Sequence, residues 1–364
     1  MQKCRYCQNE IEIFLDLSDI PVSVTSDSQI IDIGIKVYKC SSCGLIQKIA
    51  TEDIQNHYFN QFHSQSLVDG DEQIKFVNGI AYPRSELIIN NIKFDIKEKG
   101  TLLDIGTGSG VFLKSFQKKY PQWELSAQDI QLNSAEQLFK IIKKDNFYLG
   151  DISNIKNQYD FVSIIGVLGH IPNLLKFLND LKNLIDNNGK MVMFTPNIQK
   201  NLFSVVIIDN ITHFNKSILY KILSHYFKKV DFFEFVQNEI TIGINFEQNG
   251  ESFHEVEENF DIQQQAVMLE KFVRYIHHSQ ETFIVLGSAT VSTYLAAILK
   301  ERLLYFVDED ITKHHKKHLN KDIKKFEDID KRYKIILPFL DDLTIQKIKE
   351  RYKSYSFLSY QETL

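Results

Sequence analysis

The sequence predicts an α/β protein built from three parts. All four cysteines lie before residue 44, a glycine-rich turn follows an apolar strand in "LLDIGTGSG" (102–110), and strand–helix alternation resumes near residue 283. Strands that alternate with helices indicate largely parallel sheets covered by helices. We therefore expect a cysteine-rich module over 1–65, an α/β core over 66–250, a helical connector over 251–280 and a smaller α/β domain over 281–364.

Composition narrows the classes of partner. The 364 residues are 43% hydrophobic and 24% charged, which is typical of a soluble globular protein. The formal net charge is −5 without a long basic stripe, and this disfavours a nucleic-acid partner. No uncharged apolar run approaches the roughly 18 residues that span a bilayer, and the first residues do not form a signal peptide. We expect a cytoplasmic protein without a membrane partner.

The cysteines form two Cys-x-x-Cys pairs, Cys4 with Cys7 and Cys40 with Cys43. Two such pairs complete a tetrahedral zinc site, whereas disulfides are disfavoured in a reducing compartment. Because sulfur fills all four positions, no position remains for water. The predicted zinc is structural rather than catalytic.

The glycine-rich turn is the clearest sign of a ligand site. Phosphate, dinucleotide and S-adenosylmethionine sites all begin with a strand, a tight turn and a helix N-terminus. A P-loop requires lysine after its glycines, but Gly110 is followed by Val111. Gly106, Gly108 and Gly110 are spaced one residue too tightly for a dinucleotide fingerprint.

The strands after this turn carry polar residues at their ends. "WELSAQD" ends in Asp129, about 20 residues after the turn, where a carboxylate can accept both ribose hydroxyls. "FYLGD" places Asp151 within reach of an adenine, and "YDFVSIIGV" leads into "LGHIP" with His170. A helix over 173–185 and a strand over 190–196 follow. Ligands of open α/β sheets bind outside the carboxyl ends of the strands, where all these residues fall.

Together these motifs resemble class I S-adenosylmethionine-dependent methyltransferases, with a Rossmann-like core. The resemblance rests on residues 104–110, on Asp129, on Gly150 with Asp151, and on "YDFVSIIGVLGHIPN…NNGKMVMFTPN". It implies that the glycines pass under the methionine part of the cofactor, that Asp104 faces its amino group and that Asp129 holds the ribose. We expect these cofactor-binding residues: Asp104, Gly106, Gly108, Gly110, Asp129, Ile130, Asp151, Ile152 and Gly166.

A narrower resemblance covers about 350 residues. "CRYCQNEIEIFLDLSDIPVS…VYKCSSCGLIQ" is similar to the zinc module of nucleotide-sugar C-methyltransferases, whose third domain is a small α/β unit. That family carries a Tyr-x-Glu-His segment thought to deprotonate the sugar, and here Ile207, Asp209 and Asn210 take the Tyr, Glu and His positions. Methylation of carbon needs a positioned base more than methylation of oxygen or nitrogen does. The resemblance therefore implies a methyltransferase for a nucleotide-linked sugar or related small metabolite, with C-, O- and N-methylation left open.

Three residues are candidates for acid–base chemistry. His170 is expected beside the methyl group as base or substrate ligand, and the alternative is a loop histidine satisfied by the backbone. His213 in "THFN" is the second candidate, with packing before a helix capped by Asn215 as its alternative. Asp209 could orient either histidine. Two alternative functions are a non-catalytic S-adenosylmethionine-binding module and a zinc-containing RNA methyltransferase. We expect the protein to be a monomer or a homodimer.

Overall fold

The computed structural model describes residues 2–52, 54, 74–77, 80–91, 96–132, 135–233, 238–246 and 261–363. The chain divides into two compact units. The first contains Met1–Ile11, Cys40–Asn197 and Ile211–Glu258, and the second contains Glu12–Lys39, Ile198–Asn210 and Asn259–Leu364. The expected boundaries at residues 65 and 250 lie outside the described residues. They stay predictions, as does the boundary at residue 280.

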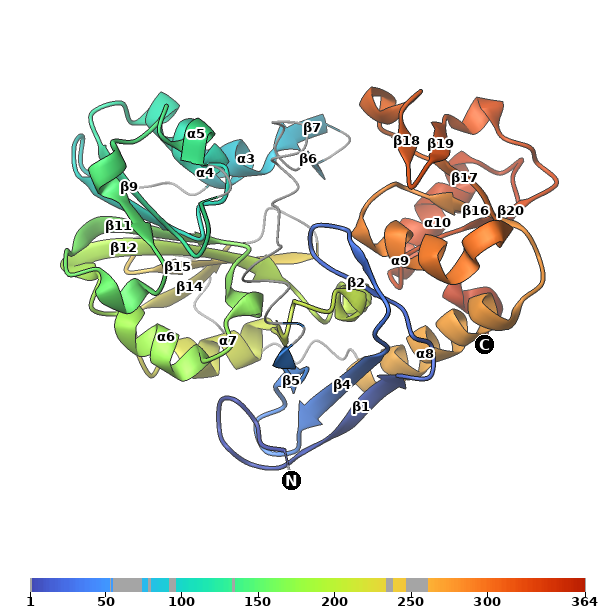
Figure 1. Ribbon diagram of the computed structural model, residues 1–364, viewed down its shortest axis with the longest axis horizontal. Coiled ribbons are helices and arrows are strands. Elements are labelled where there is room, and N and C mark those ends of the chain that lie inside the picture. The colour runs from blue at the N-terminus through green and yellow to red at the C-terminus, as the bar shows by residue number, and fades with distance from the viewer. Residues whose placement is uncertain are drawn as a thin grey trace. The chain divides into compact units, whose positions relative to one another are not determined.

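A seven-stranded mixed sheet forms the centre of the first unit (Figure 1). Its order is β10-β9-β8-β11-β12-β15-β14. The first five of these strands in that order pair in parallel, and β15 is antiparallel to both β12 and β14. The strands are β8 (Thr101–Ile105), β9 (Glu124–Asp129), β10 (Phe147–Leu149), β11 (Tyr159–Ile165), β12 (Ile185–Pro196), β14 (Val230–Phe233) and β15 (Glu239–Ile244).

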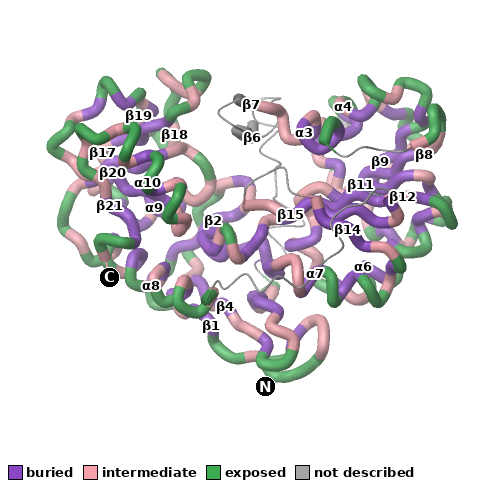
Figure 2. Tube along the Cα trace, turned by 180° about the vertical axis from the view of Figure 1, so that it is seen from behind, coloured by how far each residue is buried: buried purple, intermediate pink, exposed green. Residues whose placement is uncertain are grey.

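Helices cover both faces of this sheet (Figure 1). α3 (Arg84–Asn91) and α4 (Val111–Lys119) pack on one face, and α6 (Leu174–Leu181) and α7 (Lys216–Leu223) pack on the other. Strand side chains alternate between the two cores, as the two-residue period requires. In β12, Val192 and Phe194 join the core under α3 and α4, whereas Met191 and Met193 join the core under α6 and α7. Figure 2 shows the strands buried between these layers.

β12 is longer than the expected strand over 190–196. Tyr159 of β11 pairs with Ile185, but Phe161 pairs with Lys190, so the residues between Ile185 and Lys190 bulge from the ladder. A bulge adds residues to one strand without breaking the sheet, which explains why the Asn-Asn-Gly segment reads as a loop in the sequence.

The N-terminal residues contribute short strands. β1 (Ile11–Leu17) and β4 (Ile35–Cys40) run through the boundary between the units. In the first unit, β5 (Ile46–Gln47) pairs antiparallel with β13 (Thr212–His213), and β6 (Ile74–Val77) pairs with β7 (Ile80–Pro83). In the second unit, β2 (Ser23–Val24) pairs with β3 (Ile30–Ile31).

The second unit has its own six-stranded mixed sheet, in the order β18-β19-β17-β16-β20-β21. Its strands are β16 (Phe283–Leu286), β17 (Leu303–Val307), β18 (Lys317–His318), β19 (Lys321–Lys324), β20 (Lys334–Ile336) and β21 (Phe357–Leu358). Its helices include α8 (Ile262–His278), α9 (Thr290–Leu299) and α10 (Asp342–Arg351). The strand–helix alternation expected after residue 283 is therefore present, and the chain is α/β with mixed sheets.

Within the described part of the chain, each helix is too short or too polar to cross a bilayer.

Candidate functional site

The glycine-rich turn connects β8 to α4 and adopts backbone angles that suit glycine. Gly106, Gly108 and Gly110 have φ of 66°, 54° and 77°, in the left-handed region that other residues rarely adopt. A Cβ atom at Gly106 would lie 2.3 Å from Cγ2 of Val167, in the segment that follows β11. Glycine is therefore required at this position for two reasons, the positive backbone angle and the close approach of two loops.

Asp104 lies at the end of β8 and is almost completely buried. Ser163 of β11 donates a hydrogen bond to its carboxylate at 2.6 Å from Oγ to Oδ1. Burial raises the pKa of Asp104 to about 7, and the Ser163 hydrogen bond opposes part of that rise. A buried carboxyl group with this pKa suits a cationic ligand such as an amino group, because the cation would favour the ionised form.

Asp129 ends β9 beside the same turn. Its carboxylate accepts hydrogen bonds from the backbone N–H groups of Gly108 at 2.8 Å and Gln131 at 3.2 Å. Burial raises its pKa, and these N–H groups oppose the rise. A carboxylate has about four lone-pair positions, so Asp129 keeps capacity for ligand hydroxyl groups. Ile130 follows it and is half-buried.

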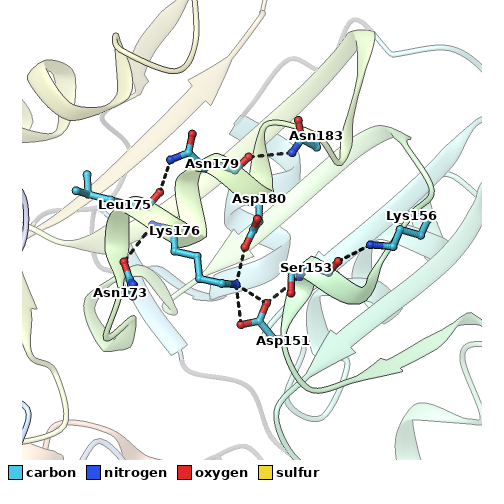
Figure 3. A network of polar contacts seen from close by, with 9 residues as sticks. All are labelled: Asp151, Ser153, Lys156, Asn173, Leu175, Lys176, Asn179, Asp180 and Asn183. Atoms are coloured by element: carbon cyan, nitrogen blue, oxygen red, sulfur yellow. Dashed lines mark hydrogen bonds and ion pairs between the residues drawn. The ribbon is translucent and has the colours of Figure 1, made fainter.

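Asp151 lies at the next position along the carboxyl edge, after β10, and belongs to an ionic network (Figure 3). It caps a short 3-10 helix, η2 (Ile152–Asn154), by accepting from Ser153 N at 2.8 Å. Lys176 of α6 lies 3.1 Å from its Oδ1 and 2.7 Å from Oδ2 of Asp180. The Ser153 N–H and the Lys176 ammonium lower the pKa of Asp151. Asp151 is exposed, whereas the neighbouring Ile152 is buried.

His170 lies in a second short 3-10 helix, η3 (Leu168–His170), which follows β11 at the carboxyl edge. The chain bends at Gly166, which has φ of 76° and donates to Phe194 O at 2.8 Å. His170 N donates to Val167 O at 2.9 Å, and its side chain is half-buried. The imidazole therefore belongs to the segment that packs against the glycine turn, and it is partly exposed.

His213 is on β13 and is almost completely buried. Its Nε2 atom is buried and has no hydrogen-bond partner in the part of the chain that the structure describes. Burial holds the pKa of His213 well below its usual value, and the charges of Lys48 and Arg5 and the neighbouring His170 lower it further. The side chain is therefore neutral near pH 7 and a weaker base than an exposed histidine.

The structure brings His170 and His213 onto adjoining segments, because Ile211 N donates to Gly169 O at 2.9 Å. Asp209 belongs to the second unit. There Ser26 donates to both carboxylate oxygens, from N at 2.9 Å and from Oγ at 2.5 Å. The orienting role expected for Asp209 stays a prediction.

Residues 83–219 match the family described as methyltransferase domain. The chain carries a methyltransferase domain. The methyltransferase class expected from the sequence is confirmed by this match, which includes the glycine turn, all the acidic residues above and both histidines.

The methyltransferase domain also has relatives of known sequence or structure. An uncharacterized protein of Methanocaldococcus jannaschii is 28% identical over 154 residues, which are 41% of this chain and 62% of that protein. Human N-acetylserotonin methyltransferase, solved with S-adenosylmethionine, is 18% identical with a TM-score of 0.37, over 44% of this chain and 50% of the human chain. An Aquifex aeolicus S-adenosylmethionine-dependent methyltransferase is 19% identical with a TM-score of 0.35, over 44% and 87%.

The four cysteines lie together next to the methyltransferase domain's α6 and α7 core. Their sulfur atoms are all within 4.8 Å of one another, with 3.6 Å between Cys4 and Cys43 and 3.4 Å between Cys7 and Cys40. A tetrahedral site with Zn–S bonds of about 2.3 Å would separate its sulfurs by about 3.8 Å. Each pair is followed by a residue with positive φ, Gln8 at 61° and Gly44 at 77°. Four converging thiols on two tight turns fit a structural zinc ion.

Sequence reasoning missed three polar residues near β13, one half-buried and two buried. Arg5 lies between the first two cysteines, and Gln47 and Lys48 follow the second pair. Gln47 and Lys48 are each only 2% exposed. A charged residue inside a Cys-x-x-Cys pair was the available signal for Arg5. Lys48 offered none, since a lysine at the end of a short strand usually points to solvent.

Proposed function

We propose that this protein is an S-adenosylmethionine-dependent methyltransferase that acts on a small-molecule acceptor. The main support for this proposal is the geometry of the glycine turn. Gly106 packs on the segment that leads to His170, and the backbone N–H of Gly108 donates a hydrogen bond to Asp129. One loop thus joins an expected cofactor ligand to an expected base.

The cofactor site is assigned from the carboxyl edge of the sheet. Asp104 would face the amino group, Asp129 would accept the ribose hydroxyls, and Asp151 would lie by the adenine, with Ile130, Ile152 and Gly166 lining the site. The order three-two-one-four-five of the first five strands supports a Rossmann-like core, since doubly wound sheets bind ligands at that edge. The bound cofactor would supply an electrophilic methyl group on a sulfonium.

His170 is the proposed base. It is half-buried at the carboxyl edge, whereas the pKa of the buried His213 is held well below the usual value. Histidine is the side chain that enzymes most often use as a general base. His213 is better placed to contact the acceptor than to remove its proton.

The acceptor class is proposed as a nucleotide-linked sugar or similar metabolite. Support comes from the likeness of the N-terminal segment to the zinc module of nucleotide-sugar C-methyltransferases. The carboxylate of Asp209, at the family's Glu position, accepts two hydrogen bonds from Ser26. This engagement favours oxygen or nitrogen over carbon as the methylated atom. A structural zinc ion at the four cysteines completes the proposal, and a cytoplasmic location and a monomer or homodimer remain predictions.

A binding and turnover experiment tests the function. Calorimetry should detect S-adenosylmethionine binding by the zinc-loaded chain, and transfer of a labelled methyl group should then be measured over a panel of sugar nucleotides. The same panel without the nucleotide separates recognition of the sugar from recognition of the nucleotide. Binding without transfer to any acceptor would favour a non-catalytic S-adenosylmethionine-binding module. Absence of binding would refute the proposal.

A further inference from the structure

The β5–β13 ladder lies beside η3. Lys48 N donates to Ile211 O at 2.9 Å, as in an antiparallel ladder. Ile211 N donates to Gly169 O, next to His170. Lys48 O accepts from Nη2 of Arg5 at 2.6 Å. The Arg5 guanidinium therefore enters the ladder where η3, β5 and β13 meet.

Donor atoms at this junction are buried without acceptors. Gln47 Oε1 accepts from both N and Nε of Arg5, at 3.1 and 3.2 Å, which fixes the orientation of the Gln47 amide. Among the described residues, neither Nε2 of Gln47 nor Nη1 of Arg5 has a hydrogen-bond partner. Nε2 of His213 has none either, and it donates in one neutral tautomer and accepts in the other. A buried unsatisfied donor costs about 1–3 kcal/mol, and more when it is charged. Such a group of donors indicates a ligand that supplies acceptor oxygens.

The junction is also cationic. The charged or titratable groups that act on His213 are Lys48, Arg5 and His170, all of them basic. Arg5 and Lys48 therefore place two positive charges beside His213.

We propose that Arg5, Gln47, Lys48 and His213 form a subsite for an oxyanion of the acceptor, a phosphate or a carboxylate, next to His170. This inference rests on the proposed function for the identity of the acceptor. In this proposal the first cysteine turn has a second role besides zinc binding, because it holds Arg5 at the junction. Arginine suits the task, since its fork matches phosphate and carboxylate oxygens.

Zinc offers a competing use for the same charges. A zinc ion with four thiolates carries a net charge of −2, which Arg5 and Lys48 could balance without any ligand. That account predicts that the two cations serve zinc retention, whereas the subsite predicts that they serve anion binding. The unpartnered donors of Arg5 and Gln47 favour the subsite, because zinc–sulfur bonds leave them unsatisfied.

The test titrates inorganic phosphate, pyrophosphate and acetate into the zinc-loaded chain by calorimetry, without cofactor. The variants are Lys48→Met and Arg5→Lys, with Lys118→Met as control, because Lys118 is exposed on α4. We expect the wild type to bind at least one anion, more weakly at high salt. Lys48→Met should weaken that binding about ten-fold or more, and Lys118→Met should not. Arg5→Lys keeps the charge but loses the fork, and should weaken pyrophosphate binding.

The outcomes separate the alternatives. Preference for phosphates identifies a phosphate-bearing acceptor, and preference for acetate identifies a carboxylate. Failure of all three anions to bind, or equal binding by Lys48→Met with its zinc retained, overturns the subsite, as does loss of zinc with unchanged anion binding. Cofactor titration and methyl transfer to uncharged acceptors are measured in parallel. If these succeed while no anion binds, only the subsite fails. If anions bind but S-adenosylmethionine does not, only the proposed function fails.

Discussion

The carboxylate of Asp129 accepts a hydrogen bond from the backbone N–H of Gly108, at 2.8 Å, and so joins the end of β9 to the middle of the glycine turn. The bond holds the turn in its left-handed conformation and keeps the acid at the carboxyl edge. A ligand that contacts either residue is therefore sensitive to both.

Removing this carboxylate should weaken cofactor binding. Hydrogen bonds to a charged group are worth about 1.5–3 kcal/mol, so Asp129→Ala should reduce S-adenosylmethionine affinity by about ten-fold or more. Calorimetry measures the change. Asp145→Ala removes an exposed acid from the same region and should leave affinity unchanged. Unaltered binding by a folded Asp129→Ala protein would refute the ribose assignment.

The raised pKa of Asp104 should make folding stability depend on pH. The unfolded side chain titrates near 3.8 and the folded one near 7, so the folded protein holds the extra proton between these values. Stability from this group is complete below pH 4 and is lost as pH rises through about 7. Asp104→Asn should flatten this part of the curve in denaturant unfolding between pH 5 and 8, while Asp145→Asn should not. Identical slopes for wild type and Asp104→Asn would contradict the assignment.

Gly106 should be less tolerant of a side chain than Gly150. Both have positive φ, which costs alanine about 1–2 kcal/mol, but only at Gly106 would the new Cβ meet a neighbour, Val167. Gly106→Ala should therefore destabilise the protein more than Gly150→Ala in thermal unfolding. Adding Val167→Ala should recover part of the loss. Equal effects of the two glycine substitutions would show that the contact with Val167 is unimportant.

The four cysteines should bind about one zinc ion per chain, because they form a complete tetrahedral set. Metal analysis measures the content, and Cys43→Ser should lower it. Chelation should loosen the N-terminal turns, since the energy of metal binding contributes to folding, while cofactor binding persists. A purified protein with less than about a tenth of an equivalent, or turns that stay folded without metal, would argue against a structural zinc.

Turnover should depend on His170. If this histidine is the base, His170→Ala should reduce the methyl-transfer rate by about 10²–10⁴ with little change in cofactor affinity. Asn210→Ala should cost far less, because an amide cannot accept a proton usefully near pH 7. His213→Gln should raise the KM for the acceptor more than it lowers kcat. The reverse pattern, with turnover lost only in the His213 variant, would move the base to β13.

The local features of the methyltransferase domain could be predicted from the amino-acid sequence. The strand–turn–helix at 101–119, the acids that end β9 and follow β10, and the Asn215 cap of α7 all depend on neighbouring residues and on periods of two or 3.6. The spacing of the cysteines likewise predicted a four-thiol cluster. Such features need little knowledge of the rest of the chain.

Contacts between residues far apart in the chain follow from the packing of the folded protein. It placed Arg5, Gln47 and Lys48 beside β13, more than 160 residues later in the chain, and gave Asp209 the Ser26 donors in the second unit. The fold also leaves Asp151 exposed beside Lys176. It buries His213, and this burial lowers the pKa of the imidazole. Burial and long-range contact depend on the packing of the whole chain, and burial changes the cost of charge. The hydrogen-bond partners and pKa values of these side chains therefore could not be predicted from the local sequence pattern.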